Sequence, residues 1–483
     1  MTTSTVASQA EVAAAPRPTM SDSTLPRANP RAKPPIVRSL RCAACGSRVD
    51  VKTPLSWRCP NAKGNDRHHV LLIESDVAPL RRTKHKNPFI AFRRYLAWDA
   101  FADANGMSED DRDALIEELD AKIASVAGTG FVFTPFARAD KLSDALGFSQ
   151  NGGVWVKDET HNVAGSQKSR HLFTELLHLV AAERLGLAPW SSASGSSSGT
   201  ATNPRPPLAI ASCGNAAFAA STLAHALKWP IQVFVPEHAD AVLVQRLRDL
   251  GADMVHCPRR ADDPPGDPCV HRFREATRDG AIPFGVQGPE NAWCLDGGRT
   301  IGWEMAYVAE HMEPPLIARL FVQVGGGAFA ASLAEGFHAG GTRAALHAVQ
   351  AEGCAPLARA WQASSKYKTA IDAATHWGEC MTPWSGTPTS FADGILDDET
   401  YDWVSVCRAM RASGGWPVVA SERHVHEAYE LAHRTTDIDV SPTGASGLAG
   451  LLAARDRVSN DERVAIVFSG IRRETPKPLA LRA

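Results

Sequence analysis

The chain has 483 residues, of which 44% are hydrophobic and 22% are charged, and its net charge is −2. This composition is typical of a globular protein with about two or three domains. A near-neutral charge gives no reason to expect nucleic acid or an anionic membrane as a partner. No apolar run approaches the ~18 residues of a transmembrane helix, so we expect no membrane partner either.

Residues 1–37 are rich in Ala, Ser, Thr and Pro and contain few large apolar residues, so we expect a disordered tail. They lack the basic-then-apolar pattern of a secretory signal. The ten cysteines are too few for a disulfide scaffold in so long a chain, and most are scattered singly. We therefore expect a cytoplasmic protein.

Residues 38–75 contain a Cys-x-x-Cys-Gly sequence, the knuckle that presents two thiolates to one Zn²⁺. A third cysteine and a histidine complete a Cys₃His set, which predicts a zinc-ribbon-like unit. No further cysteine follows at short spacing, so a metal-free remnant or unrelated cysteines remain the alternative. The candidate ligands are Cys42, Cys45, Cys59 and His68, with His69 as the alternative to His68.

Residues 110–126 carry apolar side chains at helical spacing, which predicts a helix. From about residue 130 to residue 475, short β-branched runs alternate with longer stretches rich in Ala and Leu. This alternation is typical of an α/β fold in which helices cover both faces of a parallel sheet. The predicted strands are Val154–Val156, Leu208–Ala211, Ile231–Val235, Met254–His256, Leu320–Val324, Ala345–Val349 and Val464–Phe468.

Two stretches interrupt the alternation. Residues 191–207 are rich in Ser, Gly, Thr and Pro, and we expect a flexible surface insertion there. Residues 365–400 are less regular, and they form either a loop over the functional site or a plain surface connection.

Lys168 is the residue of greatest chemical interest. It follows a short apolar strand and a polar turn that contains Gly165 and Ser166, and a predicted helix begins there. A lysine held after such a turn, inside an otherwise apolar fold, can lose its proton and attack an aldehyde. The alternative is a lysine placed at a helix start for its charge alone.

A glycine-rich turn follows the predicted strand Leu320–Val324 and opens the next helix. Glycines let the backbone approach a ligand closely, and free N–H groups at a helix N-terminus favour a dianion. The turn therefore predicts a phosphate cradle, with a simple tight turn as the alternative. Its residues are Gly325, Gly326, Gly327 and Ala328.

Two further segments place polar groups at the start of predicted helices. The amide of Asn215 can donate to a ligand oxygen, and Ser212, Cys213 and Gly214 before it are suited to a substrate carboxylate. The hydroxyl of Thr443 can face a ring nitrogen without holding it protonated. A helix cap is the alternative role for both segments.

Together these motifs resemble the fold-type II family of enzymes that use pyridoxal 5′-phosphate (PLP), which includes threonine synthase and threonine/serine dehydratase. The resemblance spans about residues 130–470. It implies that Lys168 forms the Schiff base with the cofactor. It also implies that Asn215 contacts the cofactor's O3′ oxygen, Gly325–Ala328 its phosphate, and Thr443 its ring nitrogen.

The same resemblance implies the domain organisation. We expect two parallel-sheet α/β domains, at residues 130–300 and 301–475, with the cofactor between them. The zinc-ribbon-like unit precedes them, and the family resemblance implies a homodimer.

Within the family, the Cys-x-x-Cys-Gly unit and the segments 296–304 and 350–357 resemble threonine synthases. The lysine motif departs from theirs, because Gln167 stands in place of Phe and Ser169 in place of Asp. The substrate can therefore differ. Arg170 is a candidate for binding a substrate phosphate, with a structural role as the alternative.

We therefore predict a PLP-dependent lyase that acts on a hydroxy- or O-substituted L-amino acid. Its lysine takes the Cα proton as general base, and the β-substituent then leaves. Three alternatives remain open: a threonine synthase acting on O-phosphohomoserine, a β-replacement enzyme, and a non-catalytic protein that binds PLP.

Overall fold

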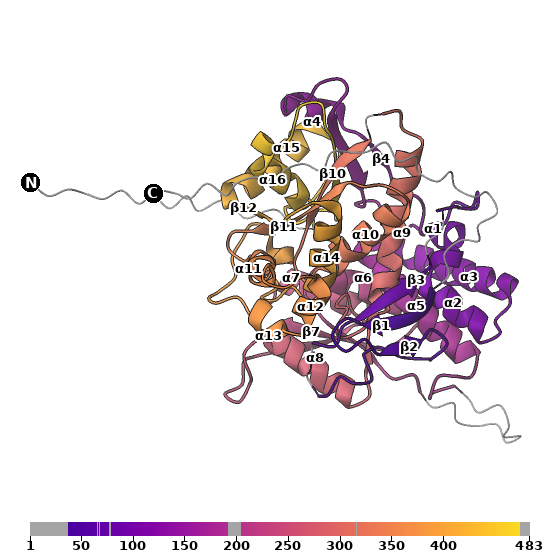
Figure 1. The fold of residues 1–483 in the computed structure, drawn as a ribbon. Coiled ribbons are helices and arrows are strands. Elements are labelled where there is room, and N and C mark those ends of the chain that lie inside the picture. The colour runs from indigo at the N-terminus through magenta and orange to yellow at the C-terminus, as the bar shows by residue number, and fades with distance from the viewer. Residues whose placement is uncertain are drawn as a thin grey trace, which may run out of the picture. The chain divides into compact units, whose positions relative to one another are not determined.

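The computed structural model describes residues 37–64, 66, 68–76, 79–191, 204–314 and 316–473. The expected tail up to residue 36 and most of the expected insertion at 191–207 lie outside this part. Figure 1 shows the order of the elements along the chain. Within the described ranges, no helix is both long and apolar enough to cross a membrane.

The N-terminal part forms a small antiparallel sheet followed by helices. Its strands are β1 (Val37–Cys42), β2 (Arg48–Asp50) and β3 (Leu71–Ser75), in the order β2-β1-β3. The helices are α1 (Pro88–Ala91), α2 (Ala97–Ala104) and α3 (Glu109–Ala127). Helix α3 confirms the predicted helix at 110–126. The side chain of Ser108 caps its start, and Gly128, with φ of +76°, ends it.

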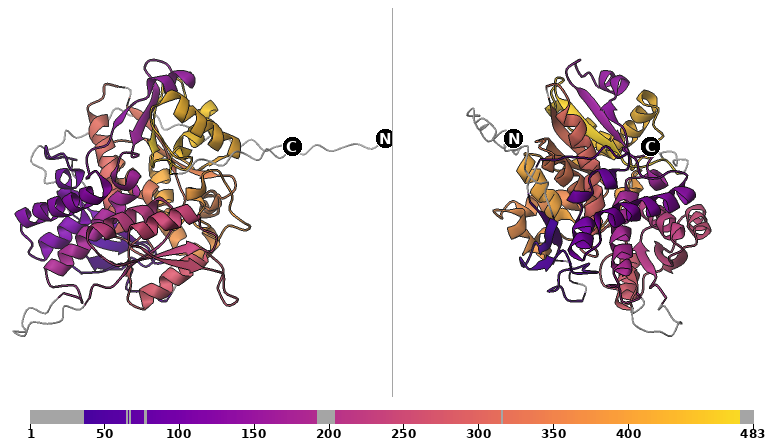
Figure 2. Two further views of the ribbon diagram at one scale, coloured as in Figure 1. Left: turned by 180° about the vertical axis from the view of Figure 1, so that it is seen from behind. Right: turned by 90° about the vertical axis from the view of Figure 1, so that its right-hand side faces the viewer.

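A six-stranded sheet forms the larger α/β layer. All its neighbouring strands are parallel except β4, which pairs antiparallel with β5 at one edge. Figure 2 shows purple and yellow strands side by side, and these are β5 and β13, from opposite ends of the sequence. In sheet order the strands are β12 (Val418–Ala420), β11 (Ala345–Ala351), β10 (Ile317–Gln323), β13 (Arg463–Phe468), β5 (Gly153–Asp158) and β4 (Phe136–Arg138).

A second, parallel sheet has four strands in the order β8-β7-β6-β9. They are β8 (Asp253–Cys257), β7 (Ile231–Pro236), β6 (Leu208–Ala211) and β9 (Ile282–Pro283). All seven predicted strands are present in the two sheets. Sheet membership does not follow the expected division at residue 300, however, because β4 and β5 pair with the C-terminal strands.

Helices cover these sheets, and two of them approach each other closely. Gly302 on α9 faces α10 so tightly that an added Cβ would lie 2.2 Å from the carbonyl oxygen of Leu333. A Cβ added to Gly336 on α10 would likewise lie 2.2 Å from the carbonyl oxygen of Arg299. The principal helices are α5 (Lys168–Arg184), α6 (Asn215–Ala226), α9 (Cys294–Glu310) and α10 (Ala328–Ala339).

The remaining helices flank this frame. They are α4 (Asp140–Ala145), α7 (Ala241–Asp249), α8 (Pro268–Arg278), α11 (Pro356–Ser364), α12 (Ala370–Ala374), α13 (Trp377–Cys380), α14 (Trp403–Ser413), α15 (Glu422–Thr435) and α16 (Ser446–Ala453).

Candidate active site

The segment after β13 brings the predicted motifs together. Gly470 forms a β-bridge with Ser166, two residues before Lys168. A Cβ added to Gly470 would lie 2.8 Å from the amide nitrogen of Asn215, so Asn215 is also close. The N–H of Ser469 donates to the carbonyl of Gly444, next to Thr443, over 3.3 Å. Three motifs that are distant in sequence therefore meet at the carboxyl end of one central strand, where open α/β sheets bind ligands.

The local backbone fixes the position of Lys168. Ala164 and Gly165 both have positive φ, +54° and +65°, which turns the chain sharply after β5. The N–H of Gln167 then donates to the carbonyl of Ser469 over 3.0 Å, and α5 begins at Lys168. The lysine therefore lies in the first helical turn, beside the end of β13.

The surroundings of Lys168 make its amine easier to deprotonate than that of an exposed lysine. Burial lowers the pKa of Lys168, while the nearby Asp397, Cys294 and Asp402 act in the opposite direction. The residue keeps part of its surface accessible, so a reactant can reach it. A partly accessible amine with a lowered pKa is suited to nucleophilic attack and proton transfer.

The glycine turn lies against two carboxylates. Asp397 accepts a hydrogen bond from the backbone N–H of Gly326. A Cβ on Gly325 would lie only 2.4 Å from an oxygen of Asp397, so glycine is needed for this approach. Asp402 lies over Gly327, and its backbone N–H donates to the carbonyl of Gly326 over 2.8 Å. The turn therefore holds a carboxylate oxygen of the protein itself, and its predicted role as a phosphate cradle stays a prediction.

Burial shifts both carboxyl groups toward the neutral form. It raises the pKa of Asp397 to about 6, against the attraction of Lys168. It raises the pKa of Asp402 to about 7, against a hydrogen bond from the N–H of Gly288 and the charge of Lys168. One oxygen of Asp402 is buried without a hydrogen-bond partner among the described residues. Sequence analysis missed both residues, since they belong to an irregular segment.

Asn215 begins α6, and its amide is held in place. Its side-chain oxygen accepts a hydrogen bond from Nε of Arg473 over 2.6 Å. This leaves the amide nitrogen directed toward Gly470. Ser212 to Gly214 precede it as a partly exposed turn, in which the N–H of Gly214 donates to the Ser212 hydroxyl over 3.3 Å.

Two hydroxyl groups lie in the same region. The Thr443 hydroxyl accepts a hydrogen bond from the N–H of Gly394 over 3.0 Å, so it faces the 393–394 turn. Ser469, which sequence analysis missed, follows β13 directly and accepts a hydrogen bond from Nε2 of Gln323 over 2.7 Å. A Ser-Gly pair at the end of a buried strand was the available signal.

Neutral and apolar groups complete the surroundings of Lys168. His171 is fully buried one helical turn away, and burial together with the Lys168 charge lowers its pKa to about 3. Its Nδ1 donates to the carbonyl of Cys294 over 2.7 Å. Burial also raises the pKa of the Cys294 thiol well above its usual value. Both groups are therefore neutral near pH 7 and add no charge to the site.

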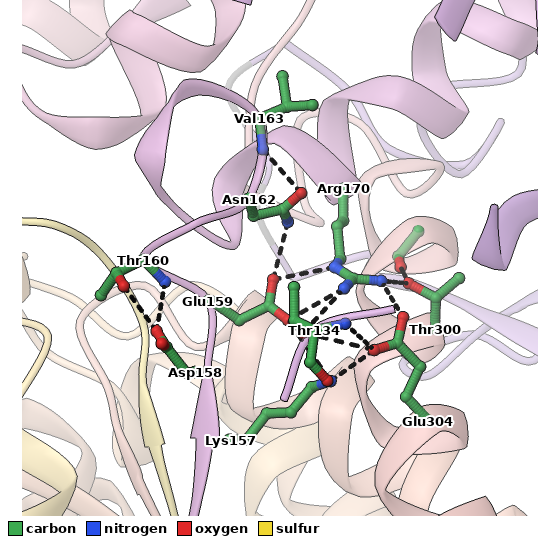
Figure 3. Close-up of polar contacts among 11 residues, drawn as sticks. Thr134, Lys157, Asp158, Glu159, Thr160, Asn162, Val163, Arg170, Thr300 and Glu304 are labelled. Atoms are coloured by element: carbon green, nitrogen blue, oxygen red, sulfur yellow. Dashed lines mark hydrogen bonds and ion pairs between the residues drawn. The ribbon is translucent and has the colours of Figure 1, made fainter. Parts of the chain in front are cut away.

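Arg170, a candidate for binding a substrate phosphate, is part of a closed structural network instead (Figure 3). Its guanidinium donates to Glu159 over 2.9 Å and to Glu304 over 2.6 Å. The fully buried Lys157 also binds Glu304 and donates to the carbonyl of Thr134 over 2.8 Å. Two cations face two carboxylates, and every charge has a partner, so Arg170 is not free to bind a substrate.

The N-terminal cysteines do meet, with one change in the predicted set. The ligand atoms of Cys42, Cys45, Cys59 and His69 all lie within 4.8 Å of one another, as expected for one metal ion. His69 replaces the predicted His68, whose ring stacks on Trp377 at 5.7 Å. Neighbouring residues on an extended chain point in opposite directions, so only one of the two histidines can face the thiolates.

This Cys/His unit contacts segments that lead to Lys168. The indole nitrogen of Trp293 donates to the carbonyl of Ser56 over 3.1 Å, and Cys294 follows directly. The N–H of Leu55 donates to His178 on α5 over 3.2 Å. The unit therefore supports α5 and α9 at the site.

The sequence pattern of the family "Pyridoxal-phosphate dependent enzyme" matches residues 129–470. The chain belongs to this family. Among curated proteins, this PLP-dependent enzyme is 23% identical to a threonine synthase from Methanocaldococcus jannaschii, over 73% of this chain and 76% of that protein.

Solved structures show the same fold. The processed form of a threonine deaminase from Solanum lycopersicum matches 76% of this chain and 91% of its own, with 20% identity and a TM-score of 0.52. Maize serine racemase matches 74% of this chain and 92% of its own, with 18% identity and a TM-score of 0.53. The fold-type II expectation is thereby confirmed.

The residues of this PLP-dependent enzyme fit the family's cofactor. Lys168 supplies an accessible amine for an aldehyde. The glycine turn at the N-terminus of α10 donates a backbone N–H to an oxygen of Asp397. A phosphate cradle needs the same kind of donor.

Proposed function

We propose that this protein is a PLP-dependent lyase that acts on a hydroxy- or O-substituted L-amino acid, of the threonine/serine ammonia-lyase type. The observation that carries the proposal is the position of Lys168. Its partly accessible amine has a lowered pKa and interacts electrostatically with Asp397, which lies against the glycine turn. The similarity to a threonine deaminase and to a threonine synthase supports the same substrate class.

Each residue has a defined role in this proposal. PLP, once bound, supplies an aldehyde that links to Lys168 and a ring that accepts electrons. With the cofactor and substrate bound, the amine of Lys168 would remove the Cα proton of the substrate as general base. Asn215 orients the cofactor at O3′, and the turn Ser212–Gly214 holds the substrate carboxylate through backbone N–H groups.

The partner of the ring nitrogen distinguishes elimination from transamination. A carboxylate there would hold the nitrogen protonated and strengthen electron withdrawal, whereas a hydroxyl does not. Thr443 and Ser469 are the two candidates, and their hydroxyls support elimination. We favour Ser469, because its backbone carbonyl accepts the N–H of Gln167, which keeps this residue near Lys168.

An activity panel tests the proposal. The PLP-loaded protein is offered L-threonine, L-serine and O-phosphohomoserine separately, and 2-oxo acid, phosphate, threonine and D-serine are assayed. We expect 2-oxo acid from threonine or serine without phosphate release. Lys168→Ala should remove this activity and the lysine-linked PLP absorbance, whereas Lys141→Ala, at an exposed lysine of α4, should change neither.

Other products would assign another reaction. Phosphate and threonine from O-phosphohomoserine would identify a threonine synthase, which the curated relative supports. D-serine without oxo acid would identify a racemase. Oxo acid retained in the Lys168→Ala variant would contradict the role of Lys168.

For the N-terminal unit, the ligand set Cys42, Cys45, Cys59 and His69 supports a structural Zn²⁺ site. All four tetrahedral positions come from the protein, which leaves no open position for catalysis. Homodimer assembly and cytoplasmic location are also part of the proposal, and light scattering of the purified protein tests the dimer.

A further inference from the structure

Residues 395–402, here called the acidic strap, lie across the glycine turn. The side chain of Thr400 would be 3.0 Å from a Cβ on Gly327, and the Tyr401 ring 3.0 Å from one on Gly326. The N–H of Asp402 donates to the carbonyl of Gly326 over 2.8 Å. The strap is therefore anchored to the turn that is expected to bind phosphate.

The carboxylate of Asp397 occupies the anion position of that turn. It accepts the N–H of Gly326, and one oxygen lies 2.4 Å from the Cβ position of Gly325. A phosphate at the same turn needs the same backbone donor. A dianion and a carboxylate in so small a space would repel each other strongly.

The charges around Asp397 are not balanced. The group that attracts it is the ammonium of Lys168, whereas Asp398 and Asp267 repel it. Asp402 faces the same lysine. Adding a phosphate would bring two more negative charges. Linking Lys168 to an aldehyde would also reduce the positive charge that this lysine offers to Asp397 and Asp402.

We propose that Asp397 is a tethered ligand of the glycine turn, which the phosphate of the cofactor must replace, so that the acidic strap moves when PLP binds. This inference rests on the proposed use of PLP. It makes Asp397 a residue that sets the affinity of the cofactor's phosphate without taking part in the reaction.

The structure offers space for this movement. A pocket of about 140 Å³ borders the strap and is lined by Asp398 and Tyr401 on one side and by Asp267, His271 and Arg274 on the other. Asp398 and Tyr401 border this volume directly, so this part of the strap has adjacent space, whereas Ile395 at its start packs in the hydrophobic core.

Titration of the cofactor-free, full-length protein with two aldehydes tests the proposal. PLP carries the phosphate and pyridoxal lacks it, and the lysine-linked absorbance reports binding of both. We expect Asp397→Asn to bind PLP about tenfold or more tightly than the wild-type protein, with pyridoxal affinity changed by less than about twofold. Asp398→Asn removes the same charge one residue away, and it should change the affinity of either aldehyde by less than about threefold.

The outcomes separate the two proposals. If neither aldehyde produces the lysine-linked absorbance in any variant, the proposed function fails. If PLP binds but Asp397→Asn binds it no more tightly, or if pyridoxal gains as much as PLP, only the tethered-ligand proposal fails. A shared gain would mean that Asp397 acts on Lys168 and not on the phosphate.

Hydrogen exchange gives an independent measurement on the wild-type protein. PLP should speed exchange in residues 395–402, because the N–H of Asp402 loses its contact with Gly326. Pyridoxal should leave this exchange unchanged. Unchanged or slower exchange with PLP would contradict the movement of the strap.

Discussion

Lys157 and Lys168 lie close in sequence, at the end of β5 and the start of α5, yet their surroundings differ. Lys157 is fully buried and belongs to a network in which Lys157 and Arg170 face Glu159 and Glu304. Lys168 is partly accessible and faces Asp397 and Asp402, and one oxygen of Asp402 lacks a hydrogen-bond partner in the described part of the chain.

The difference distinguishes a cluster with a structural role from a cluster suited to binding a ligand. A buried network with matched charges and satisfied hydrogen bonds holds elements together, and nothing in it is left to react. A buried group of unmatched charges costs stability, and it persists where a ligand or substrate supplies what is missing. By this criterion Lys168 is the lysine that we propose for the chemistry.

The largest effect is expected from breaking the matched network. Arg170→Leu leaves two buried carboxylates with one cation, and we expect a loss of about 3–5 kcal/mol in the free energy of unfolding. Arg184→Leu, on the same helix but at an exposed ion pair with Glu118, should cost less than about 1 kcal/mol. Urea unfolding measures both. Similar losses in the two variants would mean that the buried network stabilises the protein no more than an exposed ion pair does.

The Cys/His unit extends the comparison to a cluster that we propose binds a metal ion. The sulfur atoms of three cysteines and the ring of His69 converge, and Zn²⁺ would compensate the charge of the cysteines once they lose their protons. We expect chelation of the metal to lower the free energy of unfolding by about 2–4 kcal/mol. It should also reduce activity, because the unit supports Trp293 and α5. Metal analysis with thermal unfolding measures this, and an unchanged melting temperature in metal-free protein would argue for a remnant.

Asp402 should show the cost of an unmatched charge. Its pKa is raised from 3.8 to about 7 in the folded protein, so its stabilising contribution is complete below pH 3.8 and is lost as the pH rises through 7. Asp402→Asn should therefore stabilise the protein by about 2 kcal/mol at pH 8, with the gain shrinking toward pH 4. Thermal unfolding across this range measures the trend, and a gain that is independent of pH would contradict the assignment.

The smallest expected effect sharpens the assignment of the ring-nitrogen partner. Ser469→Ala should lower kcat/KM about tenfold and shift the absorbance of the bound cofactor. Thr443→Val should change kcat/KM less than about threefold, because that hydroxyl faces Gly394. A larger loss of kcat/KM in Thr443→Val than in Ser469→Ala would favour Thr443 as the partner of the ring nitrogen.

Periodicity identified the long buried strands, and all seven predicted strands are present. Within the two α/β sheets it missed β4, β9 and β12, which have only two or three residues and so carry too little pattern. It also did not reveal that β5 joins the C-terminal sheet, because strand pairing depends on contacts between distant residues.

Motifs at strand-to-helix junctions marked the segments of the candidate site in advance, at Lys168, Asn215 and the glycine turn, although their roles stay predictions. Asp397 and Asp402 were missed because the strap has no repeating pattern and its partners lie far away in sequence. The choice between His68 and His69 depends on which side of the backbone faces the three cysteines. The spacing of cysteines and histidines in the sequence is compatible with either histidine.

Borohydride reduction of the PLP-loaded protein, followed by peptide mapping, tests the central claim most directly. Reduction fixes the cofactor on the lysine to which it is linked. We predict that the label lies on Lys168, in the segment that begins α5. A label on Lys157 or on a surface lysine, with Lys168 unmodified, would contradict the account.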